Sequence, residues 1–179
     1  MKVKENLLFF GAYPPPFGGI ASNLYNLMPE LHKKGFNVTS LTFSNENKII
    51  KKNSFNNIFI NKKSFFTKNI FSITYFYFKY FFLKKGLSYK KFFRIVIESY
   101  CLIKYIEKYK TKFIFMYGNE LGYPIPIIRK IYGDKIIIIY QVLGAFYLTP
   151  HKFINERKYF DIIFKNSNII FSSSFYCAS

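Results

Sequence analysis

The chain has 179 residues, half of them hydrophobic, and a formal net charge of +18 from 27 Lys and Arg against 9 Asp and Glu. This length fits one domain, and the hydrophobic content excludes a disordered tail because aromatic and aliphatic residues occur throughout the sequence. The basic excess has two explanations. One is an anionic partner, and the other is the Lys, Asn, Ile, Phe and Tyr bias of proteins from AT-rich genomes.

Residues that bind soft metal ions or form disulfides are scarce. Cys101 and Cys177 lie far apart and match no metal-ligand spacing, and His32 and His151 are the two histidines. We therefore expect no disulfide framework, no zinc site and a reducing, cytoplasmic environment. The apolar run near the N-terminus, Leu7–Phe10, is shorter than the roughly 7–15 residues of a secretory signal core.

The first elements are a strand and a helix separated by a proline-rich loop. The buried-strand pattern Leu7–Phe10 ends at Gly11, and three prolines exclude helix or central strand before Gly18-Gly19. From Ile20 to Lys34 the apolar spacing predicts a helix with an expected kink at Pro29. The residues expected on its apolar face are Ile20, Leu24, Leu27, Met28 and Leu31.

The next segment alternates between apolar and polar stretches. We expect a strand at Val38–Phe43, a polar loop at Ser44–Asn57 and a short strand at Ile58–Ile60. The aromatic segment Phe65–Leu83 favours a helix packed on the core, with an aromatic surface at a membrane interface as the alternative. Its longest uncharged stretch, Asn69–Phe78, falls far short of the roughly 20 residues that span a bilayer.

Helices and strands continue to alternate to the end of the chain. The run Ile136–Ile139 is continuously β-branched, as in a parallel strand covered on both faces. The other expected elements are helices at Tyr89–Lys108, Pro124–Tyr132 and Phe153–Phe164 and strands at Phe113–Tyr117 and Ile169–Phe171. This alternation predicts a single α/β domain over residues 1–179, with a Rossmann-like parallel sheet and helices on both faces.

Three loops at the expected carboxyl ends of strands are candidate ligand contacts, namely residues 11–19, 118–123 and 141–149. Gly18 and Gly19 directly precede a helix, where free N–H groups and the helix dipole suit a diphosphate, although a turn that needs two glycines would look the same. The glycine spacing matches neither the dinucleotide fingerprint nor a P-loop. Asn119 and Glu120 follow a strand and are either contacts to ligand hydroxyls or a solvated turn.

The stretch from Leu7 to Ala21, with its proline-rich loop and Gly-Gly before a helix, resembles the opening of family-4 glycosyltransferases. The passage from the first helix through Gly35-Phe36-Asn37-Val38 is similar to the same family. The segments Ile136–Gly144 and Glu156–Ser174 also resemble the later part of its N-terminal domain. The resemblance is in order along most of the chain and weak between Ser44 and Lys112.

This resemblance implies the N-terminal, acceptor-side domain of a two-domain GT-B enzyme. Such an enzyme transfers a sugar with retention from a nucleotide-sugar, without a metal or other cofactor, to a glycan or lipid-linked acceptor. It implies that Gly18 and Gly19 approach the donor diphosphate. Gln141 stands where many members have His, and its amide can hydrogen-bond a sugar hydroxyl but cannot act as a base. The family's Glu-x7-Glu region belongs to a second domain that this sequence lacks, so we expect the chain alone to be inactive.

Two function classes remain open at this stage. One is a transferase domain for a surface polysaccharide or glycolipid, either free in the cytoplasm or peripheral on the inner face of the plasma membrane. The other is a non-catalytic Rossmann-like module that docks on an anionic membrane or on a separate subunit such as a C-terminal half. A nucleic-acid partner is not expected, because the basic residues are scattered and no recognised nucleic-acid-binding motif is present.

Overall fold

The computed structural model describes residues 5–11, 19–45, 47–52, 55–84, 86–142 and 157–172, and the account below concerns these residues. The strands are β1 (Asn6–Phe10), β2 (Asn37–Ser44), β3 (Lys48–Lys52), β4 (Phe55–Asn61), β5 (Phe113–Tyr117), β6 (Ile137–Val142) and β7 (Ile169–Ser172). The helices are α1 (Gly19–Lys33), α2 (Lys62–Lys68), α3 (Ile70–Tyr80), α4 (Tyr89–Tyr109), α5 (Ile125–Tyr132) and α8 (Arg157–Lys165). Short 3-10 helices are η1 (Phe81–Lys84), η2 (Asn119–Gly122) and η3 (Gly133–Lys135).

The strands form one seven-stranded sheet in the order β3-β4-β2-β1-β5-β6-β7. All neighbouring pairs are parallel except β3 and β4. Leaving β3 aside, the parallel strands follow the 3-2-1-4-5-6 order of a Rossmann fold. The predicted fold class is therefore confirmed.

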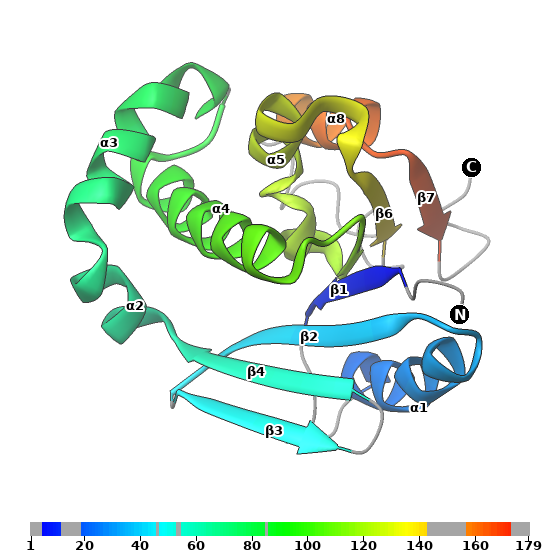
Figure 1. Ribbon diagram of the computed structural model, residues 1–179. Coiled ribbons are helices and arrows are strands. Elements are labelled where there is room, and N and C mark those ends of the chain that lie inside the picture. Colours follow the sequence, from blue (N-terminus) through cyan, green and yellow to red (C-terminus); the bar gives the residue numbers. More distant parts are fainter. Residues whose placement is uncertain are drawn as a thin grey trace.

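Helices cover both faces of the sheet, as Figure 1 shows with α1 below the sheet and α4, α5 and α8 above it. One core joins the α4–α5–α8 layer to inward side chains such as Leu8, Ile114 and Ile138. The second joins Leu24 and Met28 of α1 to the opposite face. The elements therefore form three layers with two hydrophobic cores.

The expected loop at Ser44–Asn57 is wrong, because the polypeptide there forms an antiparallel hairpin. In this hairpin β3 pairs with β4, and Ile50 lies opposite Asn57. Ile50 is partly buried against the α1 core, whereas Ile49 is exposed. An edge strand has only one strand neighbour and much contact with water, so its polar sequence resembles that of a loop.

Three further expectations need correction. Leu27 is exposed, so the described apolar stripe of α1 has Leu24 and Met28 buried and Leu31 partly buried, while the side chain of Ile20 lies outside the described part. The aromatic segment Phe65–Leu83 is not one helix, because Asn69 separates α2 from α3. Strand β6 is not covered evenly, since Ile138, Tyr140 and Val142 are buried while the alternate side chains are half-buried. The predicted kink at Pro29, which lies inside α1, stays a prediction.

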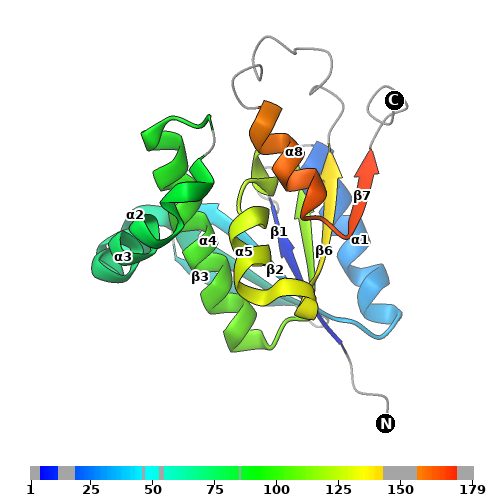
Figure 2. The ribbon, with the colours of Figure 1, turned by 90° about the horizontal axis from the view of Figure 1, so that it is seen from above.

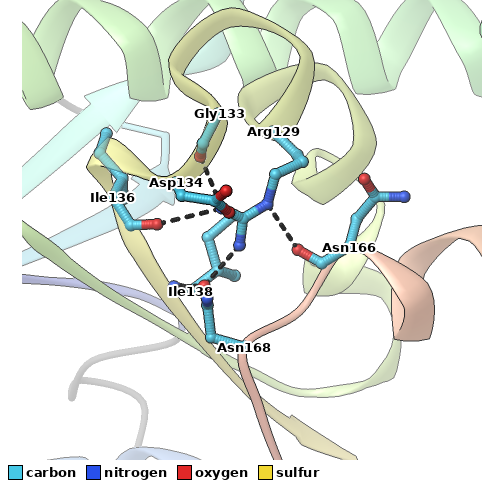
Figure 3. A network of polar contacts seen from close by, with 7 residues as sticks. All are labelled: Arg129, Gly133, Asp134, Ile136, Ile138, Asn166 and Asn168. Carbon is cyan, nitrogen blue, oxygen red and sulfur yellow. Dashed lines mark hydrogen bonds and ion pairs between the residues drawn. The ribbon is translucent and has the colours of Figure 1, made fainter.

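A polar network around Arg129 holds the amino ends of β6 and β7 against α5 (Figure 3). The guanidinium donates to the carbonyl oxygens of Asn166 at 3.1 Å and Gly133 at 2.5 Å, and to Asp134 Oδ1 at 3.1 Å. It also donates to Asn168 Oδ1, which accepts from the Ile138 N–H at 2.8 Å. One arginine thus satisfies the backbone carbonyl oxygens of Gly133 and Asn166 at the edge opposite the candidate site.

Candidate functional site

The strand order reverses direction between β1 and β5, because the chain proceeds from β1 outward to β2 and from β5 outward to β6. In an open parallel sheet, the crevice beyond the carboxyl ends at such a point is the usual place for a ligand. Figure 2 shows the strands from another direction, with β6 and β7 pointing to the same edge as the start of α4. The candidate site is therefore the edge where Gly11 follows β1 and Gly118 follows β5.

Gly11 lies against both neighbouring elements. A Cβ added there would come within 3.3 Å of Leu24 Cδ1 and 3.5 Å of Tyr117 Cβ. Its carbonyl oxygen accepts a hydrogen bond from Thr42 Oγ1 at 2.7 Å, and its N–H donates to the Leu41 carbonyl oxygen at 3.3 Å. The backbone at the end of β1 is therefore fixed to β2, and α1 packs close beside it.

Helix α1 begins at Gly19, one of the two predicted diphosphate contacts, while Gly18 lies outside the described residues. The helix connects the end of β1 to the start of the parallel strand β2, so its N-terminus faces the candidate edge. Asn23, one turn into the helix, donates from Nδ2 to the Tyr117 hydroxyl at 2.8 Å. This bond holds the start of α1 against the last residue of β5.

The second and third predicted loops meet at this edge. Gly118 has a φ of 120°, which strongly favours glycine, and its N–H donates to the Gln141 carbonyl oxygen at 3.1 Å. Asn119 is the first residue of η2, and Glu120 is the second. Two adjacent strands thus bring the predicted residues to the same edge, since Asn119 and Glu120 come after β5 and Gln141 lies near the end of β6. The rest of the third loop, residues 143–149, lies outside the described residues.

A chain of charged side chains continues from Glu120 toward α2. Arg94 Nη2 lies 2.6 Å from Glu120 Oε2, and Arg94 Nε lies 3.5 Å from Glu98 Oε1. The buried carboxylate of Glu98 also accepts a hydrogen bond from Lys62 Nζ at 2.6 Å. Sequence reasoning missed this network, for which the i,i+4 spacing of Arg94 and Glu98 was the available signal.

An open hollow lies beside Glu120 on the α4 side of the edge. Its volume is about 470 Å³. The lining residues are Ser88, Lys90, Lys91, Phe93, Arg94, Ile97 and Glu120. Glu120 therefore lies both at the carboxyl edge of the sheet and on a cationic hollow with apolar walls, a composition suited to a hydroxyl-bearing or anionic ligand.

Arg94 lowers the pKa of Glu120 through its hydrogen bond, while partial burial acts in the opposite direction. The pKa of Glu120 is therefore lower in the folded than in the unfolded protein, where it is about 4.3. The ion pair stabilises the fold fully at pH values above the unfolded pKa, and this stabilisation is lost as the pH falls through the folded pKa. We expect Glu120→Gln to lower the free energy of unfolding at neutral pH by at most about 1 kcal/mol, because the pair is half exposed. Urea unfolding at several pH values should show this difference shrinking in acid. A difference that grows in acid would contradict the assignment.

No three His, Cys, Asp or Glu side chains could together hold a metal ion in the part of the chain that the structure describes. Cys101 is buried in α4 as a free thiol, and burial raises its pKa far above the ordinary value. His151 and Cys177 lie outside the described residues. Within the described residues, the candidate site is therefore built from backbone amides, side-chain amides, one tyrosine and the Arg94–Glu120 pair.

Comparison of the architecture with solved structures identifies the fold. Sucrose-phosphate synthase from Thermosynechococcus elongatus superposes with a TM-score of 0.57 at 12% identity, over 97% of this chain and 79% of that one. The chain shares the fold of a GT-B glycosyltransferase domain. The E. coli trehalose-6-phosphate synthase structure bound with UDP-2-fluoro glucose also matches, with a TM-score of 0.51 at 11% identity.

The match to the E. coli structure covers 93% of this chain and 39% of that one, so this chain spans well under half of that neighbour. No family model matches the sequence, and no curated protein matches it either. The likeness therefore lies in the three-dimensional arrangement, and it shows the fold.

Proposed function

We propose that this chain is the acceptor-side domain of a retaining glycosyltransferase of the family-4 type, which uses a nucleotide-sugar donor. The observation that carries the proposal is the switch point between β1 and β5. There the tightly packed Gly11, the first turn of α1 and Gly118 meet. The GT-B fold of the two solved structures supports it, and one of those proteins is bound with UDP-2-fluoro glucose.

In this proposal the roles follow from the chemistry of each group. The N-terminus of α1 at Gly19, with Gly18 before it in the sequence, supplies N–H donors and a positive dipole end to the donor diphosphate. Asn119 and Gln141 hydrogen-bond hydroxyls of the acceptor, and Glu120 accepts a hydroxyl hydrogen bond while Arg94 keeps it ionised. No metal or other cofactor is assigned a role, and the reaction is placed in the cytoplasm.

Catalysis in this proposal requires a second, donor-binding domain, on the same polypeptide or on a separate one. The chain spans 39% of the E. coli neighbour, which supports the proposal that donor binding requires a second domain. Charged groups of a nucleotide-sugar need partners on both sides of a cleft, and a single domain supplies only one side. Alone, the chain is expected to bind donor weakly and to transfer no sugar.

A non-catalytic module that docks on a membrane or a partner subunit is the second candidate. The observation that favours docking on a partner subunit is the exposure of Ile169, Ile170 and Phe171 along the edge strand β7. Successive side chains of a strand point to opposite faces, so both faces of β7 present apolar groups. An exposed apolar edge strand is normally covered by another polypeptide segment.

The test is calorimetry or saturation-transfer NMR with a panel of UDP- and GDP-sugars, with and without the polypeptide encoded directly downstream. We expect binding only when the downstream part is present. Gly19→Val should then weaken it by at least about tenfold, because the added side chain obstructs the approach of the diphosphate to the helix backbone.

Asn26→Val is the matched control, since Asn26 is exposed two turns further along α1 and receives the same side chain. It should leave donor binding unchanged. An absence of donor binding under both conditions, with the chain still adsorbing to anionic vesicles, would reject the transferase function and favour the docking module.

A further inference from the structure

Helix α3 and the following η1 have two apolar faces, and the fold uses only one of them. Ile73, Phe76 and Tyr80 are buried in the main core. On the other side Phe71, Tyr75, Phe78 and Phe82 follow one another at spacings of four, three and four residues, which places them on one helical face. Their exposed fractions are 89%, 68%, 71% and 57%. These four residues are called the aromatic face below.

The core does not require the aromatic face. The buried side of α3 already contacts α4, for example through Phe76 and Tyr100, whose ring centroids lie 5.6 Å apart. Four adjacent exposed aromatic rings form an unusual surface for a domain with no partner. These rings are in contact with water in the isolated chain, so we expect a lipid surface or another molecule to cover them.

The charge around the aromatic face indicates what covers it. Between Asn47 and Ile97 the sequence has twelve Lys and Arg and no Asp or Glu. Glu98 and Glu120 pair with Lys62 and Arg94, two of these twelve, so the segment keeps a large positive excess. Lys79 lies on the face itself, with Nζ 6.0 Å from the centre of the Tyr75 ring. Exposed aromatic rings among lysines match the boundary between anionic headgroups and acyl chains.

We propose that the aromatic face docks the protein on an anionic lipid surface, with the rings at the acyl boundary and the lysines among the headgroups. None of the helices in the described ranges is long and apolar enough to cross a membrane. A helix that lies in the interface needs no such length, because only one face enters the lipid.

The docking surface adjoins the candidate site. Helix α4 follows η1, and Arg94 in its second turn pairs with Glu120 at the carboxyl edge of the sheet. The hollow beside Glu120 is lined by Lys90, Lys91 and Phe93 of the same turns. Docking would bring this edge close to the headgroups, so we assign the acceptor to the lipid-linked class. This last step alone rests on the proposed function.

The absence of tryptophan from the sequence permits a direct test on the full chain. Phe78→Trp creates a single fluorescent reporter on the aromatic face. Its emission should shift to the blue on vesicles of phosphatidylcholine with phosphatidylglycerol, and brominated lipid should quench it. Phe171→Trp is the matched control, since it places the reporter on an exposed aromatic position of β7 at the far edge of the sheet. No vesicle-induced shift is expected there.

Removal of two rings tests the contribution of the face to binding. Phe71→Ser/Phe78→Ser should reduce partitioning onto these vesicles by at least about tenfold, because each ring loses its burial in lipid. Phe171→Ser should leave partitioning unchanged. Equal partitioning of both variants and wild type would overturn the proposal, as would equal binding to pure phosphatidylcholine.

If a second copy of this chain covered the aromatic face, the result in solution would differ. If wild type forms a dimer that Phe71→Ser/Phe78→Ser dissociates and no vesicle binding occurs, the face is a self-association surface and the proposal is wrong. These measurements use no nucleotide-sugar. Failure of docking would therefore leave donor binding intact, and failure of donor binding would leave vesicle binding intact.

Discussion

Substitution of Gly122 by Ala should destabilise the fold by about 3 kcal/mol, because the added methyl group has no room. A Cβ at this position would lie 2.6 Å from both Cε2 and Cζ of Tyr140 and 3.0 Å from its hydroxyl oxygen. Tyr140 is fully buried in the main core, so its ring cannot move into solvent. Loss of chain entropy in the unfolded state favours alanine by only about 0.4–1 kcal/mol, which does not offset the clash.

Chemical denaturation of Gly122→Ala would measure this cost directly, and a double-mutant cycle with Tyr140→Leu provides the control. In the Tyr140→Leu background the ring is gone, and Gly122→Ala should cost less than about 1 kcal/mol. An equal cost in both backgrounds would show that the effect comes from the backbone of η2 and not from the Tyr140 ring.

Substitution of Lys62 by Ala should lower the free energy of unfolding by about 2–3 kcal/mol. Lys62 Nζ lies 2.6 Å from the buried carboxylate of Glu98 and 4.5 Å from the centre of the Phe43 ring. Removing one partner of a buried ion pair leaves the other charge without compensation, at a cost of about 3–5 kcal/mol when burial is complete. Here the cost is smaller, because Lys62 is about one-third exposed and Arg94 remains 3.5 Å from Glu98.

Urea unfolding of three variants separates the ion pair from other effects. Lys63→Ala removes the neighbouring exposed lysine and should change stability by no more than about 0.5 kcal/mol. Lys62→Ala/Glu98→Gln should recover much of the loss, because a neutral amide costs less to bury than an unpaired carboxylate. If the double substitution is no more stable than Lys62→Ala alone, the contact of the Lys62 ammonium with the Phe43 ring explains the effect.

The sequence by itself determined the order of most elements. Short apolar runs such as Leu7–Phe10 and Phe113–Tyr117 match β1 and β5 closely, because a strand covered by helices needs uninterrupted apolar residues. The amphipathic pattern of Tyr89–Lys108 likewise matches α4. These local patterns were sufficient to predict a parallel α/β sheet and the loops at its carboxyl edge.

Only the tertiary structure decided which edge strands form and which faces are buried. Strand β3 depends on pairing with β4, and no local pattern in Lys48–Lys52 shows that partner. In α3 the residues on both faces are aromatic or aliphatic, so periodicity could not tell the buried set from the exposed set.

The candidate site also has features that the sequence predicted and features that only the tertiary structure decided. The positions of Gly19, Gly118 and Gln141 after or before predicted elements were readable from the sequence, since each depends on one local boundary. The bonds from Asn23 to Tyr117 and from Arg94 to Glu120 join residues 94 and 26 positions apart. Such contacts depend on how helices pack across the sheet, and a single sequence records the residues but not that packing.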